Sequence, residues 1–174
     1  ELEEKLQSLD VENAIYLPNF KKLNVLEEKD LDKDYIPPFK FCIFSRVMKE
    51  KGVSDAINAV NRINSKYGKQ IATLDIYGPV EDDYKEELFS LIESSQNNCK
   101  YCGIIDSSKS VEALKSYFAL LFPTHWKHEG IPGTIIDAFS AGIPVIARKW
   151  QYCTEMISNG KNGYYYDFDK PELL

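Results

Sequence analysis

The sequence predicts an α/β fold, a doubly wound parallel β-sheet with helices on both faces. Short apolar runs rich in β-branched and aromatic residues alternate along the chain with amphipathic segments of about ten to fifteen residues. Strands and helices that alternate in this way form a parallel sheet, because right-handed crossovers pack the helices against its faces. The length of 174 residues fits one domain, 1–174, with a core of its own.

Each element follows from a local pattern. The strand patterns cover 13–19, 40–46, 71–78, 99–105, 119–123, 144–147 and 163–168. The helical patterns cover 54–67, 83–95, 110–118, 133–141 and about 153–158. Ser54 is a suitable N-cap for the first of these helices, and Gly68 is a suitable C-terminal stop. The charged segment 20–38, which ends in two prolines, is expected to be a loop.

Composition and charge exclude several classes of protein. The net charge is −6 and no basic block is present, which argues against general nucleic-acid binding. The apolar runs are too short to span a bilayer, and no signal peptide is visible, so we expect a cytoplasmic location. The first residues read as the end of a helix and the last as the start of one. We therefore expect the chain to be a piece of a longer protein.

The cysteines are expected to be reduced thiols rather than a disulfide framework, because no secretory signal accompanies them. They are Cys42, Cys99, Cys102 and Cys153. Cys99 and Cys102, followed by His125 and His128, resemble part of a zinc-binding set. The spacing of a full metal motif is missing, and the cysteine pair lies in a strand pattern. We expect no metal site.

Ligands of doubly wound sheets bind beyond the carboxyl ends of the strands, so the loops that follow strands are the candidate sites. After the strand 40–46, Arg46 and Lys51 flank a turn into a helix and could hold a phosphate. Spacing alone leaves open that both are solvated surface charges. After the strand 71–78, Gly78 lets the backbone approach a ligand or makes an ordinary turn.

The loop after the strand 119–123 carries two acids next to a helix start. Pro132 suits the first helical position and Gly133 lets the chain pass tightly, so the helix should begin at about 132. Glu129 then lies in the loop, and Asp137 lies about one and a half turns into the helix. Both carboxylates should reach one crevice, into which the free backbone N–H groups of 133–135 also point. This arrangement suits a ligand with sugar hydroxyls and phosphates. The alternative is that Glu129 only interacts with the helix dipole and that Asp137 is an exposed acid of the first turn.

Five segments in order resemble the C-terminal half of a retaining, nucleotide-sugar-dependent glycosyltransferase of the group 1 family, also called family 4. They are "YLPNF", "FSRVMKEKG", "LDIYG", "EGIPGTIIDAFSAGIPVIA" and "CTEMISNGKNGYYYD". The third of these segments ends in Gly78. Members of this family have two Rossmann-like domains that face a cleft, the GT-B fold. The sequence departs from the family pattern at Ser45, where Gly is frequent, and at Asp137, where Glu is usual.

The resemblance implies a role for each matching residue. Arg46 and Lys51 would hold the donor diphosphate and stabilise the leaving group, and Glu129 would contact the hydroxyls of the donor sugar. The segment that holds sugar, phosphate and ribose would comprise Gly130, Ile131, Gly133, Thr134 and Asp137, with Asp137 at the ribose. Glu155 matches the Glu of the closing motif. Fixed cations and helix-end dipoles can stabilise the leaving diphosphate, so neither a metal nor another cofactor is expected.

The resemblance also implies the function of the whole protein. It would transfer a hexosyl group from a nucleotide-diphosphate sugar to a glycan or lipid-linked acceptor in polysaccharide biosynthesis. The acceptor would bind to an N-terminal domain, so this piece alone should be inactive. A peripheral membrane contact of the full-length enzyme and a catalytic role for His125 or His128 stay open. A non-catalytic or epimerase-type nucleotide-sugar-binding module is the alternative. A nicotinamide-binding domain is disfavoured because no Gly-x-Gly-x-x-Gly follows a strand.

Overall fold

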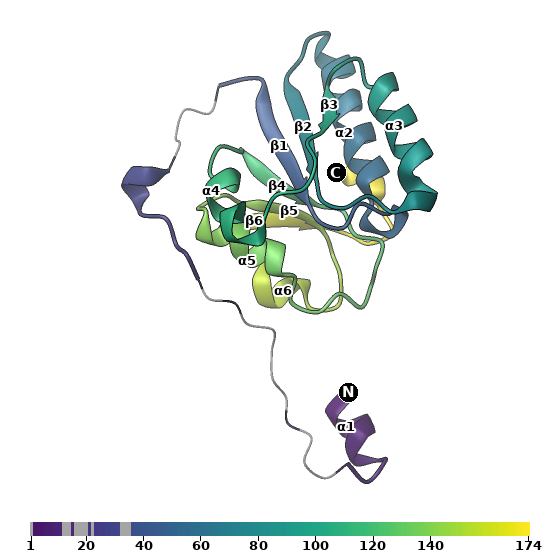
Figure 1. Ribbon diagram of the computed structural model, residues 1–174, viewed down its shortest axis with the longest axis vertical. Helices are drawn as coiled ribbons and strands as arrows, with labels where there is room; N and C mark the ends of the chain where they lie inside the picture. Colours follow the sequence, from purple (N-terminus) through teal and green to yellow (C-terminus); the bar gives the residue numbers. More distant parts are fainter. Residues whose placement is uncertain (1, 12–14, 16–20, 22, 32–35) are drawn as a thin grey trace.

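The computed structural model describes residues 2–11, 15, 21, 23–31 and 36–174. It confirms the α/β prediction, with a six-stranded, fully parallel sheet in the order β3-β2-β1-β4-β5-β6 (Figure 1). The strands are β1 (Phe39–Phe44), β2 (Ala72–Tyr77), β3 (Cys99–Tyr101), β4 (Ala119–Phe122), β5 (Val145–Arg148) and β6 (Gly163–Tyr166). The predicted strand 13–19 lies almost entirely outside the described residues.

Helices cover both faces of the sheet, as Figure 1 shows. The covering helices are α2 (Val53–Tyr67), α3 (Lys85–Ser94), α4 (Ser110–Leu114), α5 (Gly133–Ser140) and α6 (Cys153–Met156). The chain also has the helix α1 (Leu2–Gln7), whose described side chains belong to neither apolar core, and short 3₁₀ turns at Glu28–Asp30, Lys49–Lys51, Asp82–Tyr84, Ser107–Lys109 and Pro171–Leu173. One apolar core lies between the sheet and the pair α2 and α3. The other lies between the sheet and α4, α5 and α6. The fold is therefore doubly wound and Rossmann-like.

The burial of the strands explains why their sequence patterns predicted strands. All four residues of β4 are buried, as expected for a central strand covered on both faces. The six residues of β2 alternate between buried and partly buried positions, in keeping with side chains that point to opposite faces. A continuous apolar run and an alternating run thus belong to the same sheet.

Two predicted helix boundaries are wrong. The N-cap of α2 is Gly52 rather than Ser54, because the 3₁₀ turn Lys49–Lys51 runs directly into the helix. The helix predicted over 110–118 ends at Leu114. The backbone N–H of Phe118 donates to the carbonyl of Lys40 in β1 at 2.7 Å, which draws the chain into the sheet. The predicted C-terminal stop of α2 is confirmed, since Gly68 has a left-handed φ of 62°.

The strand order reverses between β1 and β4, which makes this pair the topological switch point. The loops that follow the two strands pack against each other there. The backbone N–H of His125 donates to the carbonyl of Glu50 at 2.7 Å. Gly52 has a φ of +68°, and a Cβ at this position would lie 2.0 Å from the carbonyl oxygen of Pro123. The crevice where a ligand is expected therefore has two closely packed loops at its base.

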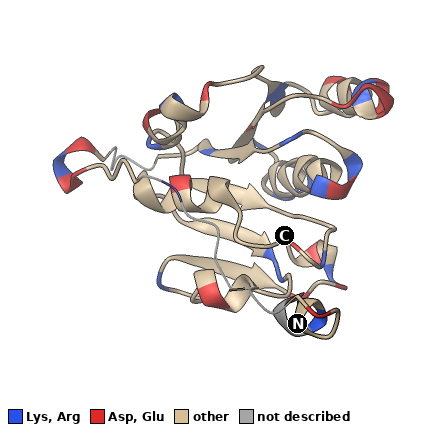
Figure 2. Ribbon diagram, turned by 60° about the horizontal axis from the view of Figure 1, so that its bottom comes forward, with Lys and Arg blue, Asp and Glu red and all other residues tan. Residues whose placement is uncertain are grey.

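Charges of both signs are interspersed over the helices and loops of the molecule. Figure 2 shows acidic and basic residues side by side. In this view, the described Lys and Arg residues form no continuous stripe. Proteins that bind nucleic acid concentrate Lys and Arg on one face, and the expectation that this chain does not bind nucleic acid stays a prediction. Among the described residues, no helix is both long enough and apolar enough to cross a membrane.

All four cysteines are free thiols, in agreement with the prediction. Cys42, Cys99 and Cys153 are buried, whereas Cys102 is partly exposed. Burial raises the pKa of the Cys99 and Cys153 thiols to about 11. Within the described part of the chain, no group of three or more His, Cys, Asp and Glu residues could hold a metal ion.

These environments predict selective alkylation. With iodoacetamide at pH 8, Cys102 of the native chain should react first, because the raised pKa makes the thiolate fraction of Cys99 and Cys153 about a hundredfold smaller than that of a free thiol. Peptide mass spectrometry after timed quenching measures the order. The three buried cysteines should react at the rate of Cys102 only after unfolding in urea. Equal labelling of all four in the native chain would contradict the described cores.

Candidate functional site

The loops after β1 and β4 and the start of α5 enclose a cavity of about 560 Å³. Its position at the carboxyl ends of the switch-point strands is where ligands of such sheets bind. The lining residues are Phe44, Ser45, Arg46, Met48, Glu50, Lys51, Trp126, Glu129, Pro132 and Thr134. Four residues predicted from the sequence, Arg46, Lys51, Glu129 and Thr134, thus come together in one cavity.

Lys51 and Glu129 form an ion pair across the cavity. Their side chains are 24% and 14% exposed, so both charges are largely removed from water. The Lys51 ammonium donates to Oε1 of Glu129, and the Thr124 hydroxyl donates to the same oxygen at 3.0 Å. Among the described residues, Oε2 of Glu129 accepts no hydrogen bond. The carboxylate is therefore held in place while one oxygen keeps capacity for a ligand hydroxyl.

Arg46 lines the same cavity but is held loosely. Its side chain is 65% exposed, and its guanidinium lies 3.5 Å from the Glu81 carboxylate. An exposed ion pair at this distance contributes roughly 0–1 kcal/mol, so the guanidinium can leave Glu81 at little cost. Arg46 is thus a mobile cation beside the fixed cation of Lys51.

The start of α5 contributes backbone and hydroxyl groups to the cavity. The helix begins at Gly133, and Pro132 is its N-cap rather than its first residue. The N–H of Ile135, predicted to be free, donates to the carbonyl of Pro132 at 3.1 Å. Thr134 has a buried hydroxyl with no hydrogen-bond partner in the described part of the structure. Such a group is unusual in a folded protein and is expected to find a partner when a ligand binds. The loop before the helix is anchored, because Nε1 of Trp150 donates to the carbonyl of Gly130 at 3.2 Å.

The glycines of the site fall into two groups. A Cβ at Gly130 or Gly133 would meet no protein atom within 4 Å, and neither residue has a positive φ. Protein packing therefore does not require glycine at these positions, and the open space is available to a ligand. Between them lies Ile131, which is partly buried.

Gly78 belongs to the other group. Its φ is +130°, and a Cβ would lie 1.7 Å from the carbonyl oxygen of Ser45. Its N–H donates to the carbonyl of Gly103 at 2.9 Å, and its carbonyl accepts from the hydroxyl of Tyr101 at 2.8 Å. Gly78 is absent from the cavity lining. Glycine at this position lets the loop after β2 pack against the loop after β1. A contact of Gly78 with a nucleotide stays a prediction.

Asp137 does not face the cavity with Glu129. The side chain is buried on α5, where the Lys21 ammonium donates to both of its oxygens at 2.6 Å. The Ser110 hydroxyl, at the start of α4, donates to Oδ2 at 2.7 Å. In this structure, the two acids therefore do not reach one crevice as expected, because the Asp137 carboxylate accepts hydrogen bonds from Lys21 and Ser110 instead. Its role at a ribose stays a prediction.

The two histidines make contacts outside the cavity lining. Nε2 of His125 lies 2.9 Å from the Asp55 carboxylate, which also pairs with the buried Arg148 at the end of β5. Nδ1 of His128 lies 3.1 Å from Oε1 of Gln151. These contacts tie the loop after β4 to α2 and to the loop after β5. A catalytic role for either histidine receives no support from this geometry. Glu155 is exposed on α6 and is likewise absent from the lining.

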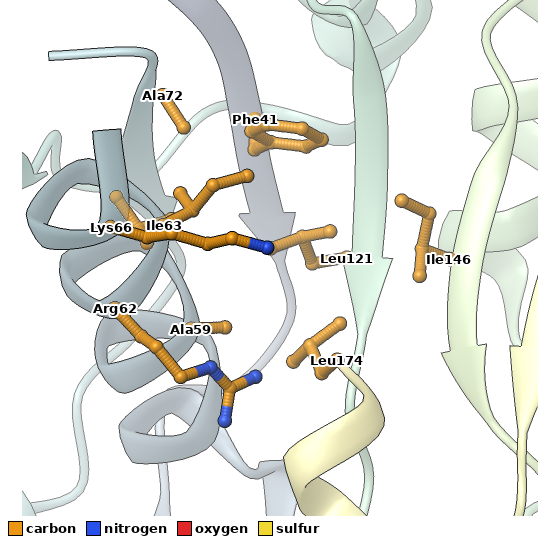
Figure 3. A pocket seen from close by; sticks show the side chains of 10 residues that line it. Phe41, Ala59, Arg62, Ile63, Lys66, Ala72, Leu121, Ile146 and Leu174 are labelled. Atoms are coloured by element: carbon orange, nitrogen blue, oxygen red, sulfur yellow. The ribbon is translucent and has the colours of Figure 1, made fainter.

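A second cavity, of about 350 Å³, lies between α2 and the sheet. Figure 3 shows apolar side chains of the strands, including Phe41, Leu121 and Ile146, opposite those of α2, with Arg62 and Lys66 beside them. No acidic residue lines this cavity within the described chain. Its chemistry does not match a ligand rich in hydroxyls, and the cavity at the switch point is the better candidate.

Several residues that shape the site were not predicted from the sequence. Thr124, Trp126 and Met48 belong to the strand-end loops, and the rule that ligands bind there could have found them. Thr124 follows β4 by two positions and holds Glu129. Lys21 and Ser110 could not have been found in this way, because they reach Asp137 from distant parts of the chain.

Comparison with known proteins identifies the class. The model of the family "Glycosyl transferases group 1" matches residues 28–174, and the chain belongs to this family. An uncharacterized glycosyltransferase of Methanocaldococcus jannaschii is 32% identical over 132 residues, which cover 72% of this chain and 30% of that relative. The matches to three curated relatives cover 30%, 41% and 37% of their lengths, so the chain spans less than half of each.

Solved structures share the fold. A TarM mutant of S. aureus, in complex with fondaparinux, alpha-GlcNAc-glycerol and UDP, has a TM-score of 0.71 at 21% identity, and the match covers 97% of this chain and 33% of that one. The pneumococcal O-GlcNAc transferase GtfA, in complex with UDP and GlcNAc, has a TM-score of 0.65 at 24% identity, over 78% of this chain and 27% of that one. The fold is that of a Rossmann-like domain of GT-B glycosyltransferases.

The two groups of glycines predict opposite effects of the same substitution. Gly78→Ala should lower the free energy of unfolding by roughly 1–3 kcal/mol, because its Cβ would collide with a backbone oxygen at a φ that alanine rarely adopts. Gly133→Ala, the matched control, should change it by less than about 0.5 kcal/mol. Urea denaturation followed by circular dichroism measures both. Equal stability of the two variants would contradict the packing described for Gly78.

Proposed function

We propose that this domain binds a nucleotide-diphosphate sugar and that the whole protein transfers the sugar, with retention, to a glycan or lipid-linked acceptor. The observation that carries the proposal is the ion pair of Lys51 and Glu129 in the cavity at the switch point. A cation and a carboxylate fixed side by side match the two parts of such a donor, its diphosphate and its sugar hydroxyls.

The diphosphate end of the donor would meet positive groups. When the bond between the sugar C1 and the diphosphate oxygen breaks, its electron pair stays on that oxygen. Lys51 would lie near this charge, Arg46 could move to it, and the N-terminal end of α5 would add the positive end of its helix dipole. Preorganised charges stabilise a leaving group without reorganisation, so the proposed reaction needs no metal.

The sugar end would meet Glu129 and Thr134. The free lone pairs of the Glu129 carboxylate accept hydrogen bonds from sugar hydroxyls, and the buried Thr134 hydroxyl gains the partner that it lacks. Gly130 and Gly133 leave space for the ligand to approach the backbone. In a front-face displacement, which retains the configuration, the acceptor oxygen would attack C1 from the face that the diphosphate leaves, and its proton would pass to the departing phosphate oxygen.

A ribose contact of Asp137, if the resemblance holds at this position, requires Lys21 to release at least one carboxylate oxygen. The TarM and GtfA structures are complexes with UDP, which makes uridine nucleotides the first to test for this chain. The acceptor would bind in a further domain of the whole protein. A role in polysaccharide biosynthesis at the cytoplasmic side of a membrane would fit this chemistry.

Binding of nucleotides to the 174-residue chain tests the donor site. Isothermal titration with UDP, GDP and ADP should show weak binding of at least one. Lys51→Ala and Arg46→Ala should each weaken it roughly ten- to hundredfold, because each removes a charge-assisted contact to phosphate. Lys100→Ala is the control, since this side chain is 67% exposed on β3 and outside the cavity. If no nucleotide binds, the donor-site proposal fails.

Transfer by the full-length protein tests Glu129. Glu129→Gln keeps the shape of the side chain and removes its charge, and we expect kcat to fall roughly 10²- to 10³-fold. Glu112→Gln serves as the control because this carboxylate is 63% exposed on α4. Incorporation of radiolabelled sugar into product measures both. Undiminished transfer by the Glu129→Gln variant would remove Glu129 from the mechanism.

A further inference from the structure

Trp126 is an exposed aromatic residue in a cavity that is also lined by charged groups. The chain has two tryptophans. Trp150 is 2% exposed, whereas Trp126 is 55% exposed and lines the same cavity as Lys51 and Glu129. A large apolar surface left open beside a candidate binding site is typical of a surface that a ligand covers.

The loop holds Trp126 in place from both sides. Its backbone N–H donates to Oγ1 of Thr124 at 3.2 Å, and the neighbouring N–H of His125 donates to the carbonyl of Glu50 at 2.7 Å. On the other side, the N–H of Gln151 donates to the carbonyl of Lys127 at 3.0 Å. The indole is therefore presented by an anchored backbone, as a binding platform requires.

Thr124 also links Trp126 to the carboxylate of the site. The same Oγ1 that accepts from the Trp126 amide donates to Oε1 of Glu129 at 3.0 Å. The backbone of Trp126 and the carboxylate of Glu129 are thus linked by one hydroxyl group within one loop. This link places Trp126 at the Glu129 side of the cavity, which is the sugar side in the proposed function.

We propose that the indole ring of Trp126 is a platform for the donor sugar, on which the apolar face of the pyranose ring packs. A pyranose has C–H groups on its faces and hydroxyls around its rim. Trp126 would pack on one face of the pyranose, while Glu129 and Thr134 would form hydrogen bonds with hydroxyls at its rim. The cavity would thus contact both the apolar and the polar surface of the sugar. The assignment deepens the proposed function and rests on it.

Tryptophan fluorescence of the 174-residue chain reads out this contact. Acrylamide quenching should report mainly on Trp126, because Trp150 is buried. The nucleotide that binds in the calorimetric titration is compared with its sugar-bearing forms, for example UDP with UDP-glucose, UDP-galactose and UDP-GlcNAc. We expect a matching sugar donor to lower the quenching constant roughly twofold or more by covering the indole, and the nucleotide alone to leave it unchanged.

Affinities of variants provide a second readout. Trp126→Ala should raise the Kd of the sugar donor roughly three- to tenfold and leave the Kd of the nucleotide alone within about twofold. Trp126→Phe keeps a flat ring and should recover most of the affinity. Tyr164→Ala is the matched control, since Tyr164 is 61% exposed on β6 and does not line the cavity. Circular dichroism confirms that each variant is folded.

Three results would overturn the inference, and they differ from failure of the donor site itself. If a nucleotide binds but its sugar-bearing forms protect Trp126 no more than it does, the platform is absent. If the nucleotide alone protects Trp126 and Trp126→Ala weakens both ligands equally, the indole contacts the base instead. If the Trp126→Ala variant binds sugar donors like the wild type, the contact contributes nothing. If no nucleotide binds at all, the proposed function fails first.

Discussion

The ion pair between Lys51 and Glu129 is the interaction on which the candidate site depends. It joins the loop after β1 to the loop after β4 at the point where the strand order reverses. Both side chains are mostly removed from water, and a charge in that position would be costly without its partner. In the proposed function, the ligand would offer an anion to Lys51 and hydrogen-bond donors to Glu129. A phosphorylated sugar carries both groups in one molecule.

Close backbone packing sets the distance across which this pair forms. Gly52 brings the turn before α2 against the carbonyl of Pro123, and Gly78 brings the loop after β2 against the carbonyl of Ser45. A side chain at either position would separate the loops. Gly130 and Gly133 have no such contact and leave space above the start of α5. Glycines that follow strands thus serve two purposes here, one in packing and one in access.

Local patterns predicted the elements well because each depends on neighbouring residues. The helix predicted over 133–141 is Gly133–Ser140, and the strand predicted over 144–147 is Val145–Arg148. The errors lie where distant groups compete with local preference. The hydrogen bond from Phe118 to Lys40 ends the helix predicted over 110–118, and the turn at Lys49–Lys51 starts α2 before the predicted cap.

The sequence by itself determined the class of fold and the loops that build the site. Arg46, Lys51 and Glu129 could be named in advance, because the carboxyl ends of parallel strands share one edge of the sheet. Only the tertiary structure decided which of the candidate groups meet. Lys51 and Glu129 are 78 positions apart and pair, whereas Asp137 is taken by Lys21, 116 positions away. Such partners are chosen by the packing of the whole chain, which no local pattern contains.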